Sequence, residues 1–269
     1  MLSKTTRTLT YALSVLYAGI GAALFFKPEA QAPIFLWSVT GFMTMTIGGW
    51  CLGNAFLGFF AARNWQWKSV YPAMAYLWSF GILESVVMIS FRDKLNFGYP
   101  VAAAYAAAVV LNALSAIFGV VDWLRIRPAS ERSEPMTSWM RGLAVTTVLF
   151  VGFLAIYGLT AQKGMTATNG EVVPEALTIL TMRSVGSFFL ALTIGMLPLL
   201  FEKNRAPFLS YGFLTLGLTV IVTAAAFAYF PQFNFSANPL GLFYIAAWIV
   251  SVVVSLSLMR KYGTGLARA

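Results

Sequence analysis

The sequence predicts an all-α, polytopic integral membrane protein whose eight transmembrane helices form a tandem duplication of a four-helix unit. Three observations predict this fold class. The 269-residue chain is 59% hydrophobic and only 10% charged, whereas soluble domains carry about 25% charged residues. Eight apolar segments are long enough to cross a bilayer. Several short motifs of the first half recur in the second half.

Each predicted span has the roughly 20 predominantly apolar residues that a membrane helix needs. The spans are 8–26, 40–61, 70–91, 99–122, 142–160, 178–200, 208–230 and 240–259. They lack the alternation of apolar and polar residues that a membrane β-barrel requires. The first span follows Lys4 and Arg7 and could imitate a cleaved signal peptide, but its apolar run is longer than a usual signal core. We therefore expect it to be retained.

The basic residues predict the orientation of the chain in the cell membrane. If the N-terminus is cytoplasmic, the cytoplasmic face collects most of the Lys and Arg residues, as membrane proteins prefer. The opposite face has only Lys27, Arg92, Lys94 and Lys163. Both termini are thus predicted to be cytoplasmic. The net charge of +9 is spread over short loops, so it does not indicate a nucleic-acid partner.

The residue inventory excludes several classes of chemistry. The chain has no histidine, so it cannot build an imidazole metal site, a His-ligated haem or a nucleophile activated by histidine. Its one cysteine, Cys51, lies in an apolar run and is expected to fill space. No phosphate-binding or metal-binding motif occurs. We therefore predict no catalytic residue and no metal ligand, and favour a protein that is not an enzyme.

A tandem repeat is predicted from recurring motifs. Segment 96–100 ends in Pro100, and Tyr105 follows five residues later; segment 234–239 ends in Pro239, and Tyr244 follows at the same distance. The predicted organisation is a first four-helix unit over 1–124, a polar cytoplasmic linker over 125–141 and a second unit over 142–269. An even number of spans in each unit gives both copies the same orientation, so the axis relating them lies along the membrane normal.

Two charges within the predicted spans are the candidate site. Arg183 lies inside span 178–200 and keeps its proton, and burying it in a bilayer costs about 2.5–3.5 kcal/mol on insertion scales. Glu84 is the only carboxylate deep within a span, at a similar depth from the same face. We predict that the two pair across the interface between the units. The pair either fixes how the units dock or forms a ligand or proton site; alternatively, Arg183 extends outward unpaired.

Four polar residues are further candidates for lining such a site: Thr46, Asn54, Asn112 and Ser184. Thr46 occupies the position in the first unit that corresponds to Arg183, so the predicted site is single and asymmetric. For Asn54 and Asn112, hydrogen bonds between helices are the simpler expectation, and contact with a substrate is the alternative.

Two motifs carry a resemblance to a known family. Leu-x-x-Gly occurs at 16–19 and again at 149–152, and segment 183–192 reads as Arg, two residues, Gly and then a Leu/Ala-rich run. On these motifs each half resembles the DoxX-like four-span membrane domains of bacteria. The first half departs from the pattern because Thr46 replaces the Arg. The resemblance implies a location in the bacterial inner membrane and an accessory or quinone-associated role, and it transfers no catalytic residue.

Two functions remain open from the sequence. The favoured one is a non-enzymatic accessory subunit or partner of a larger membrane assembly. Its expected partners are the lipid bilayer and a membrane protein, and a lipid or quinone between the halves is the candidate ligand. The alternative is a small-solute or proton-coupled transporter that uses the Arg183 and Glu84 region. Transporters usually expose more polar groups near the midplane than this chain offers, and this favours the first function.

Overall fold

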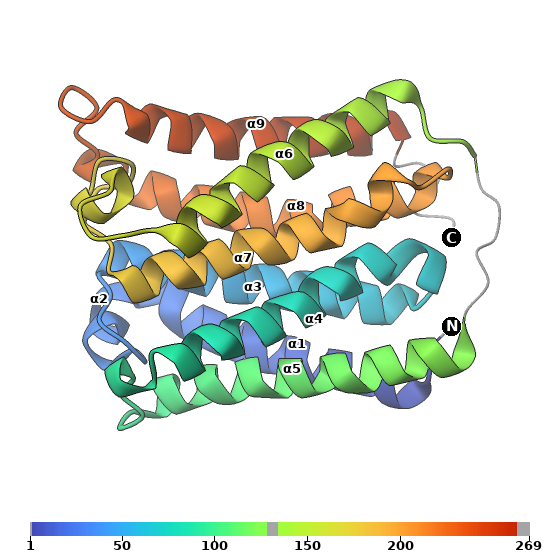
Figure 1. The fold of residues 1–269 in the computed structure, drawn as a ribbon, viewed down its shortest axis with the longest axis horizontal. Helices are drawn as coiled ribbons and strands as arrows, with labels where there is room; N and C mark the ends of the chain where they lie inside the picture. The colour runs from blue at the N-terminus through green and yellow to red at the C-terminus, as the bar shows by residue number, and fades with distance from the viewer. Residues whose placement is uncertain (1, 128–133, 263–269) are drawn as a thin grey trace.

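The computed structural model describes residues 2–127 and 134–262. Within them all regular structure is helical, and no strand occurs beyond an isolated bridge between Pro135 and Asn204. The helices are α1 (Lys4–Phe26), α2 (Pro28–Gln31), α3 (Gly41–Asn64), α4 (Trp67–Ser90), α5 (Pro100–Ile126), α6 (Ser138–Thr160), α7 (Ile179–Met196), α8 (Arg205–Ala228) and α9 (Leu240–Tyr262), with short 3₁₀ turns between some of them (Figure 1).

Eight of these helices are long and apolar enough to cross a membrane, as the sequence predicts. They are all the named helices except the four-residue α2, and α7 reaches spanning length together with the 3₁₀ turn Leu197–Leu200. Four of them begin at a hydroxyl residue whose side chain accepts from a backbone N–H three positions on. These N-caps are Ser3, Thr40, Thr137 and Thr178, and they satisfy donors that a helix start leaves free.

The predicted linker 125–141 is helical at both of its ends, because α5 continues through Ile126 and α6 begins at Ser138. Residues 128–133 of the linker, and 263–269 at the end of the second predicted unit, lie outside the described residues. The described part of the linker is attached to the connection between α7 and α8. Met136 N–H donates to the Lys203 carbonyl at 2.8 Å, and Arg205 N–H donates to the Glu134 carbonyl at 2.9 Å.

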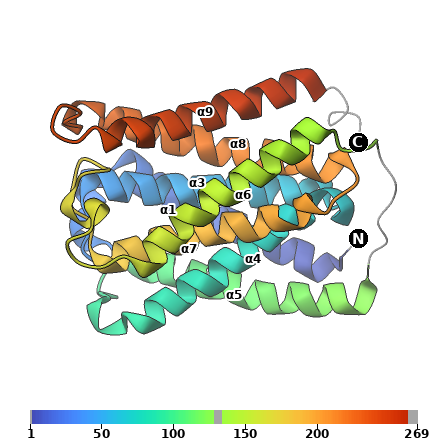
Figure 2. The same cartoon turned by 45° about the horizontal axis from the view of Figure 1, so that its top comes forward.

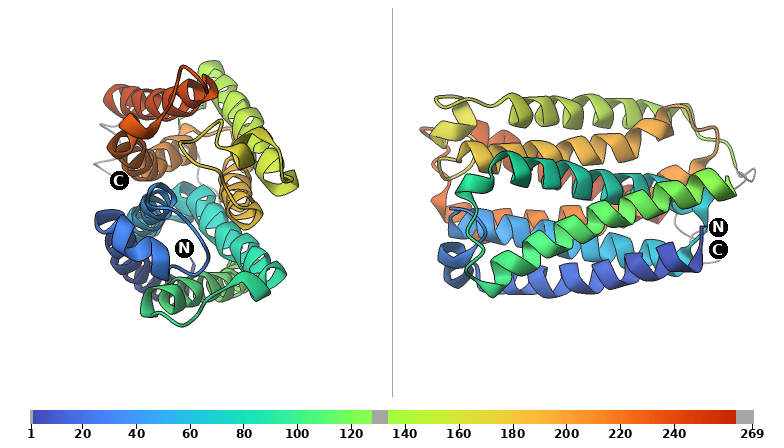
Figure 3. Two further views of the ribbon diagram at one scale, coloured as in Figure 1. Left: turned by 90° about the vertical axis from the view of Figure 1, so that its left-hand side faces the viewer. Right: turned by 60° about the horizontal axis from the view of Figure 1, so that its bottom comes forward.

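The helices run up and down and gather into two groups (Figures 1 and 2). In the first group α1 packs on α3 and α5, and α4 packs on α5, so the four helices close into a bundle (Figure 3, left). In the second group α6 packs mainly on α7, and α9 on α8. The inner helices α7 and α8 pack on α4 and α3 of the first group. The second group is thus more open than the first.

The two groups meet in a closely packed interface. A Cβ added at Gly53 on α3 would lie 2.7 Å from the Cβ of Leu218 on α8. Trp50 stacks on Phe188 of α7 with ring centroids 4.5 Å apart and an interplanar angle of 10°. Small residues let helix backbones approach in this way, and the approach leaves Trp50 and its neighbours fully enclosed.

Two ends of the bundle can be distinguished. The start of α1 and the end of α9 lie at one end, which we call the terminal end (Figure 1). Trp65 donates its indole N–H to the Leu2 carbonyl there at 3.1 Å, and the Arg205 guanidinium lies over the Tyr262 ring. The connections 27–40, 91–99, 161–178 and 229–239 lie at the opposite end, which we call the loop end.

Candidate functional site

Glu84 lies fully buried where α4 meets α5 and α7. Its Oε1 accepts hydrogen bonds from the Ser184 hydroxyl at 2.8 Å and the Tyr105 hydroxyl at 3.2 Å. Its Oε2 has no hydrogen-bond partner, and no Lys or Arg of the described residues lies within ion-pair distance of it. Glu84 is therefore a buried carboxyl group that hydroxyls hold and no cation neutralises.

The predicted ion pair between Arg183 and Glu84 is not formed in the described structure. Arg183 is half-buried, and its Nη1 donates to the Gly158 carbonyl at 3.0 Å. Gly158 lies in the last turn of α6, where the carbonyls carry the negative end of the helix dipole. Its carbonyl also accepts from the Ala161 N–H at 3.4 Å. The helix end, rather than a carboxylate, stabilises the guanidinium.

The geometry of α7 explains why Arg183 and Glu84 are kept apart. Successive residues of an α-helix are rotated by about 100°, so the side chains of Arg183 and Ser184 leave α7 in different directions. Ser184 points to α4 and Glu84, and Arg183 points to α6. Gly186, three positions after Arg183, lies on the α6 side: a Cβ there would be 2.6 Å from Leu159 N. The Arg-x-x-Gly motif of α7 thus forms the contact with α6.

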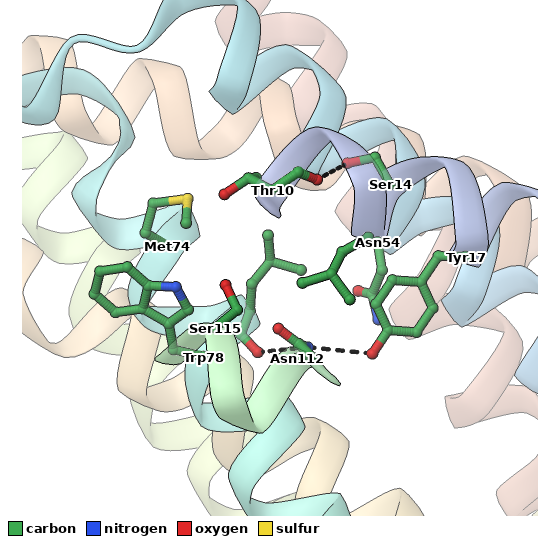
Figure 4. Close-up of a pocket in the computed structure, with 10 residues that line it drawn as sticks. Thr10, Ser14, Tyr17, Asn54, Met74, Trp78, Asn112 and Ser115 are labelled. Carbon is green, nitrogen blue, oxygen red and sulfur yellow. Dashed lines mark hydrogen bonds between the residues drawn. The ribbon is translucent and has the colours of Figure 1, made fainter. Parts of the chain in front are cut away.

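A second polar cluster occupies the interior of the first group (Figure 4). Asn112 of α5 donates its Nδ2 hydrogens to the Tyr17 hydroxyl at 3.1 Å and to the Leu77 carbonyl at 2.9 Å. Asn54 of α3 accepts from the Tyr76 hydroxyl at 2.6 Å. These bonds join α1, α3, α4 and α5, so both predicted asparagines take part in the interhelical bonding that the sequence leads one to expect.

This cluster surrounds a small cavity with about 10 Å³ open to the centre of a water molecule. Seven of the ten residues that line it carry a polar side-chain atom; the ten are Thr10, Leu13, Ser14, Tyr17, Asn54, Met74, Leu77, Trp78, Asn112 and Ser115. Two of its donors, Asn54 Nδ2 and Trp78 Nε1, are buried and have no partner among the described residues. A cavity of this size holds about one water.

Of the four predicted lining residues, only Ser184 hydrogen-bonds Glu84. The Thr46 hydroxyl donates to the Phe42 carbonyl of its own helix at 2.9 Å. Sequence reasoning missed three phenols that bond the candidate residues: Tyr17, Tyr76 and Tyr105. Spacing could have revealed Tyr17, because it ends a row of polar residues repeated every three or four positions on α1.

A pair of carboxyl groups lies at the loop end, outside the spanning helices. Glu175 accepts a hydrogen bond from the Thr40 hydroxyl, and Glu29 accepts one from the Tyr229 hydroxyl at 2.6 Å. Burial raises the pKa of Glu175 from 4.5 to about 7; the nearby Glu29 charge adds to this rise, and the bond from Thr40 opposes it. Residues of both helix groups meet in this pair.

The chemistry available at these sites is proton binding and hydrogen bonding. Within the described residues no group of three or more His, Cys, Asp or Glu side chains is placed to hold a metal ion. Glu84 combines a titratable carboxyl, two hydroxyl donors from neighbouring helices and an oxygen left free. Among the residues that the structure describes, Glu84 is the one best suited to take up and release a proton inside the bundle.

Comparison with known proteins gives no match: no protein-family model fits the chain, and no curated protein or solved structure is significantly similar to it. The resemblance to DoxX-like domains therefore stays a prediction. Function is argued from the geometry of Glu84 and its surroundings.

Proposed function

We propose that the protein is a multi-pass membrane protein that couples proton binding at Glu84 to the transport of a small solute. The single observation that carries this proposal is a fully buried carboxyl group for which the described residues supply no partner to one oxygen and no cation within ion-pair distance. Burying a carboxylate charge without a counter-ion is costly. Intramembrane carboxyl groups of this kind are typical of proton-driven transporters.

The position of Glu84 supports the coupling. Its bond to Ser184 crosses from α4 to α7, the most extensive contact between the two helix groups. A hydroxyl can donate to a carboxylate or accept from a carboxylic acid, so both protonation states can be held here with different bond strengths. Gain or loss of a proton thus acts directly on how the groups dock.

The membrane setting belongs to the same proposal. Eight helices of spanning length suggest a multi-pass membrane protein, and the basic residues of the terminal end favour a cytoplasmic location for that end. We further propose that the two groups arose by tandem duplication. The support is the recurrence of the Pro-to-Tyr motif at the starts of α5 and α9 and the same order of helices in each group.

Transport measured on protein reconstituted in liposomes tests the proposal. A panel of small polar and ionic solutes is applied with and without an inward proton gradient, and charge movement is recorded on a supported membrane. We expect at least one solute to give a gradient-dependent current that Glu84→Gln abolishes and Ser251→Ala preserves. Ser251 is a suitable control because its hydroxyl bonds only the Ala247 carbonyl of its own helix. Currents that persist in Glu84→Gln, or none for any solute, would refute proton coupling at Glu84.

A second candidate is the non-enzymatic subunit or partner of a larger membrane assembly that the sequence favours. The asymmetry of the two groups supports it. Only 17% of the most apolar stretch is buried inside the protein in α6 and likewise in α9, against 72% in α3. Helices this open have room for a further membrane protein, or for a lipid or quinone. Native mass spectrometry after mild extraction tests this candidate. A stoichiometric partner chain supports it, and a single chain that carries only bulk lipid refutes it.

A further inference from the structure

The helix α1 carries a row of polar residues that faces the interior of the first group. Thr6, Thr10, Ser14 and Tyr17 follow one another at four, four and three positions, and each is at most 3% exposed. This spacing places them on one face of the helix. Thr10 donates to the Thr6 carbonyl at 2.9 Å and Ser14 to the Thr10 carbonyl at 2.7 Å, so the oxygens of both hydroxyls remain able to accept.

The helix α5 presents a matching row to α1. Tyr105, Asn112, Ser115 and Asp122 follow one another at seven, three and seven positions, and Ala108 and Gly119 divide each step of seven into three and four. At a rise of about 1.5 Å per residue, Tyr105 and Asp122 are roughly 25 Å apart along the helix. That length approaches the roughly 30 Å thickness of the hydrocarbon core.

The two rows are bonded to each other at two places, and a cavity separates them in between. At the terminal end, Asp122 accepts from the Thr6 hydroxyl at 2.7 Å and from Ser3 N–H at 2.8 Å. Toward the loop end, Asn112 bonds the Tyr17 hydroxyl. Between these bonds lies the cavity of Figure 4, with Thr10 and Ser14 on one side and Ser115 on the other.

The cavity offers a water molecule the partners that it needs. Asn54 Nδ2 and Trp78 Nε1 are donors without a partner among the described residues, and Asn54 and Trp78 are 1% and 7% exposed. Thr10 and Ser14 supply acceptor oxygens. Buried waters typically make about three hydrogen bonds to groups that otherwise lack partners. The lining therefore fits one bound water.

We propose that these two rows and the bound water form a proton path from Asp122 at the terminal end to Glu84. The inference rests on the proposed function, because it supplies the route by which Glu84 exchanges its proton. Each hydroxyl on the path, and the bound water, receives one proton and passes one on, while the Asn112 amide keeps its protons and holds the Tyr17 hydroxyl in place. The net step moves one H⁺ from water at the terminal end to a Glu84 carboxylate oxygen, and no other bond changes.

The described side chains packed around Glu84 include no other carboxyl group, so Glu84 is the proton acceptor at the end of this path. Tyr105 of α5 donates its hydroxyl to the Glu84 Oε1. From α7, Glu84 meets Ser184, whereas Arg183 is turned toward α6. The Trp78 ring fills the space at Gly119, where an added Cβ would overlap it.

Hydrogen exchange of two tryptophans in the wild-type protein tests for the water. Trp78 Nε1 and Trp50 Nε1 are both buried without a partner, but only Trp78 lines the cavity. After transfer of the detergent-solubilised protein to D₂O, we expect the indole N–H of Trp78 to exchange at least about tenfold faster than that of Trp50, because solvent reaches Trp78 through the path. The signals are assigned with Trp78→Phe and Trp50→Phe. Equal rates, or slower exchange at Trp78, would overturn the proposal.

Infrared spectroscopy tests the connection to Glu84. The band of interest is the carboxylic-acid C=O stretch that Glu84→Gln removes, and its shift in D₂O reports exchange of the Glu84 proton. We expect Thr10→Val, which replaces one acceptor with a methyl group of the same shape, to slow this shift about tenfold. Thr193→Val is the matched control, since Thr193 also donates to a carbonyl four residues back, at Phe189, and lies outside the path.

The outcomes separate the two proposals. If no carboxylic-acid band depends on Glu84 at any pH at which the protein stays folded, proton binding at Glu84 is wrong and the proposed function fails. If the band is present but Thr10→Val exchanges as fast as wild type and Thr193→Val, only the path is wrong. Slow exchange in Thr10→Val together with fast exchange in the control supports both.

Discussion

Gly186→Ala perturbs the contact between α6 and α7 that holds Arg183 in place. The added Cβ would lie 2.6 Å from Leu159 N and 2.8 Å from Gly158 C. Ordinary contact begins at 3.4 Å, so the two backbones must separate by about 0.8 Å. Backbone atoms of two packed helices cannot move aside singly as a flexible side chain can.

Two effects set the expected decrease in the free energy of unfolding. Overpacking of this kind typically costs about 1–3 kcal/mol. A separation of this size would also stretch the 3.0 Å bond from Arg183 to Gly158, and hydrogen bonds to charged groups contribute about 1.5–3 kcal/mol. Because the two effects overlap, we expect about 2–4 kcal/mol in total, or a fall of roughly 5–15 °C in Tm.

Cys51 provides the assay, because it is the chain's only cysteine and is buried. A thiol-reactive fluorophore labels it only when the bundle opens, so fluorescence during heating in detergent reports unfolding. Gly142→Ala in α6 is the matched control, since a Cβ there meets nothing within 4 Å. We expect this control to keep or raise the wild-type Tm. A Gly186→Ala protein that melts with wild type and Gly142→Ala would refute the steric argument.

Three further outcomes are expected. Ser184→Ala removes the shorter of the two hydrogen bonds to Glu84 and lowers the unfolding free energy by about 1–3 kcal/mol. Cys51 labelling measures this, with Ser251→Ala as the control. Equal stability of the two variants would contradict the prediction. Arg183→Leu leaves the infrared band of Glu84 in place because Arg183 binds Gly158, and a shifted band would indicate that the two residues pair after all. Glu175 has a pKa raised to about 7 from 4.5, so the folded protein binds more protons between these values and its stability falls as pH rises through the window. Melting temperatures at about pH 5 and pH 8 check this, and Glu175→Gln should flatten the dependence.

Hydropathy and length determine the helical part of the fold almost completely. A helix that is apolar on all sides over about 20 residues needs no tertiary information to be recognised, and eight such helices are present in the described residues. Helix ends are less certain because hydroxyl caps extend some helices beyond the apolar run. Ser3 starts α1 and Thr137 starts α6, in both cases several residues before the predicted span.

The candidate site is only partly readable from the sequence. Arg183 and Glu84 stand out as charges in apolar runs, and helix length predicts the depth of both. The direction of each side chain around the helix axis is not predicted, although it decides which group the side chain binds. The neighbours Arg183 and Ser184 face α6 and α4 respectively. The depth of a residue in its helix gives its position along the membrane normal, but not the direction in which its side chain points within the membrane plane.

The sequence by itself thus determined that this chain forms eight helices of membrane-spanning length and that Glu84 lies deep within one of them. The tertiary structure alone decided that hydroxyls surround Glu84, that the end of α6 holds Arg183, and that polar rows of α1 and α5 face each other. Tyr17 and Asn112 are 95 positions apart, and Thr6 and Asp122 are 116 apart. Bonds over such separations depend on the packing and rotation of whole helices, which local hydrophobicity does not encode.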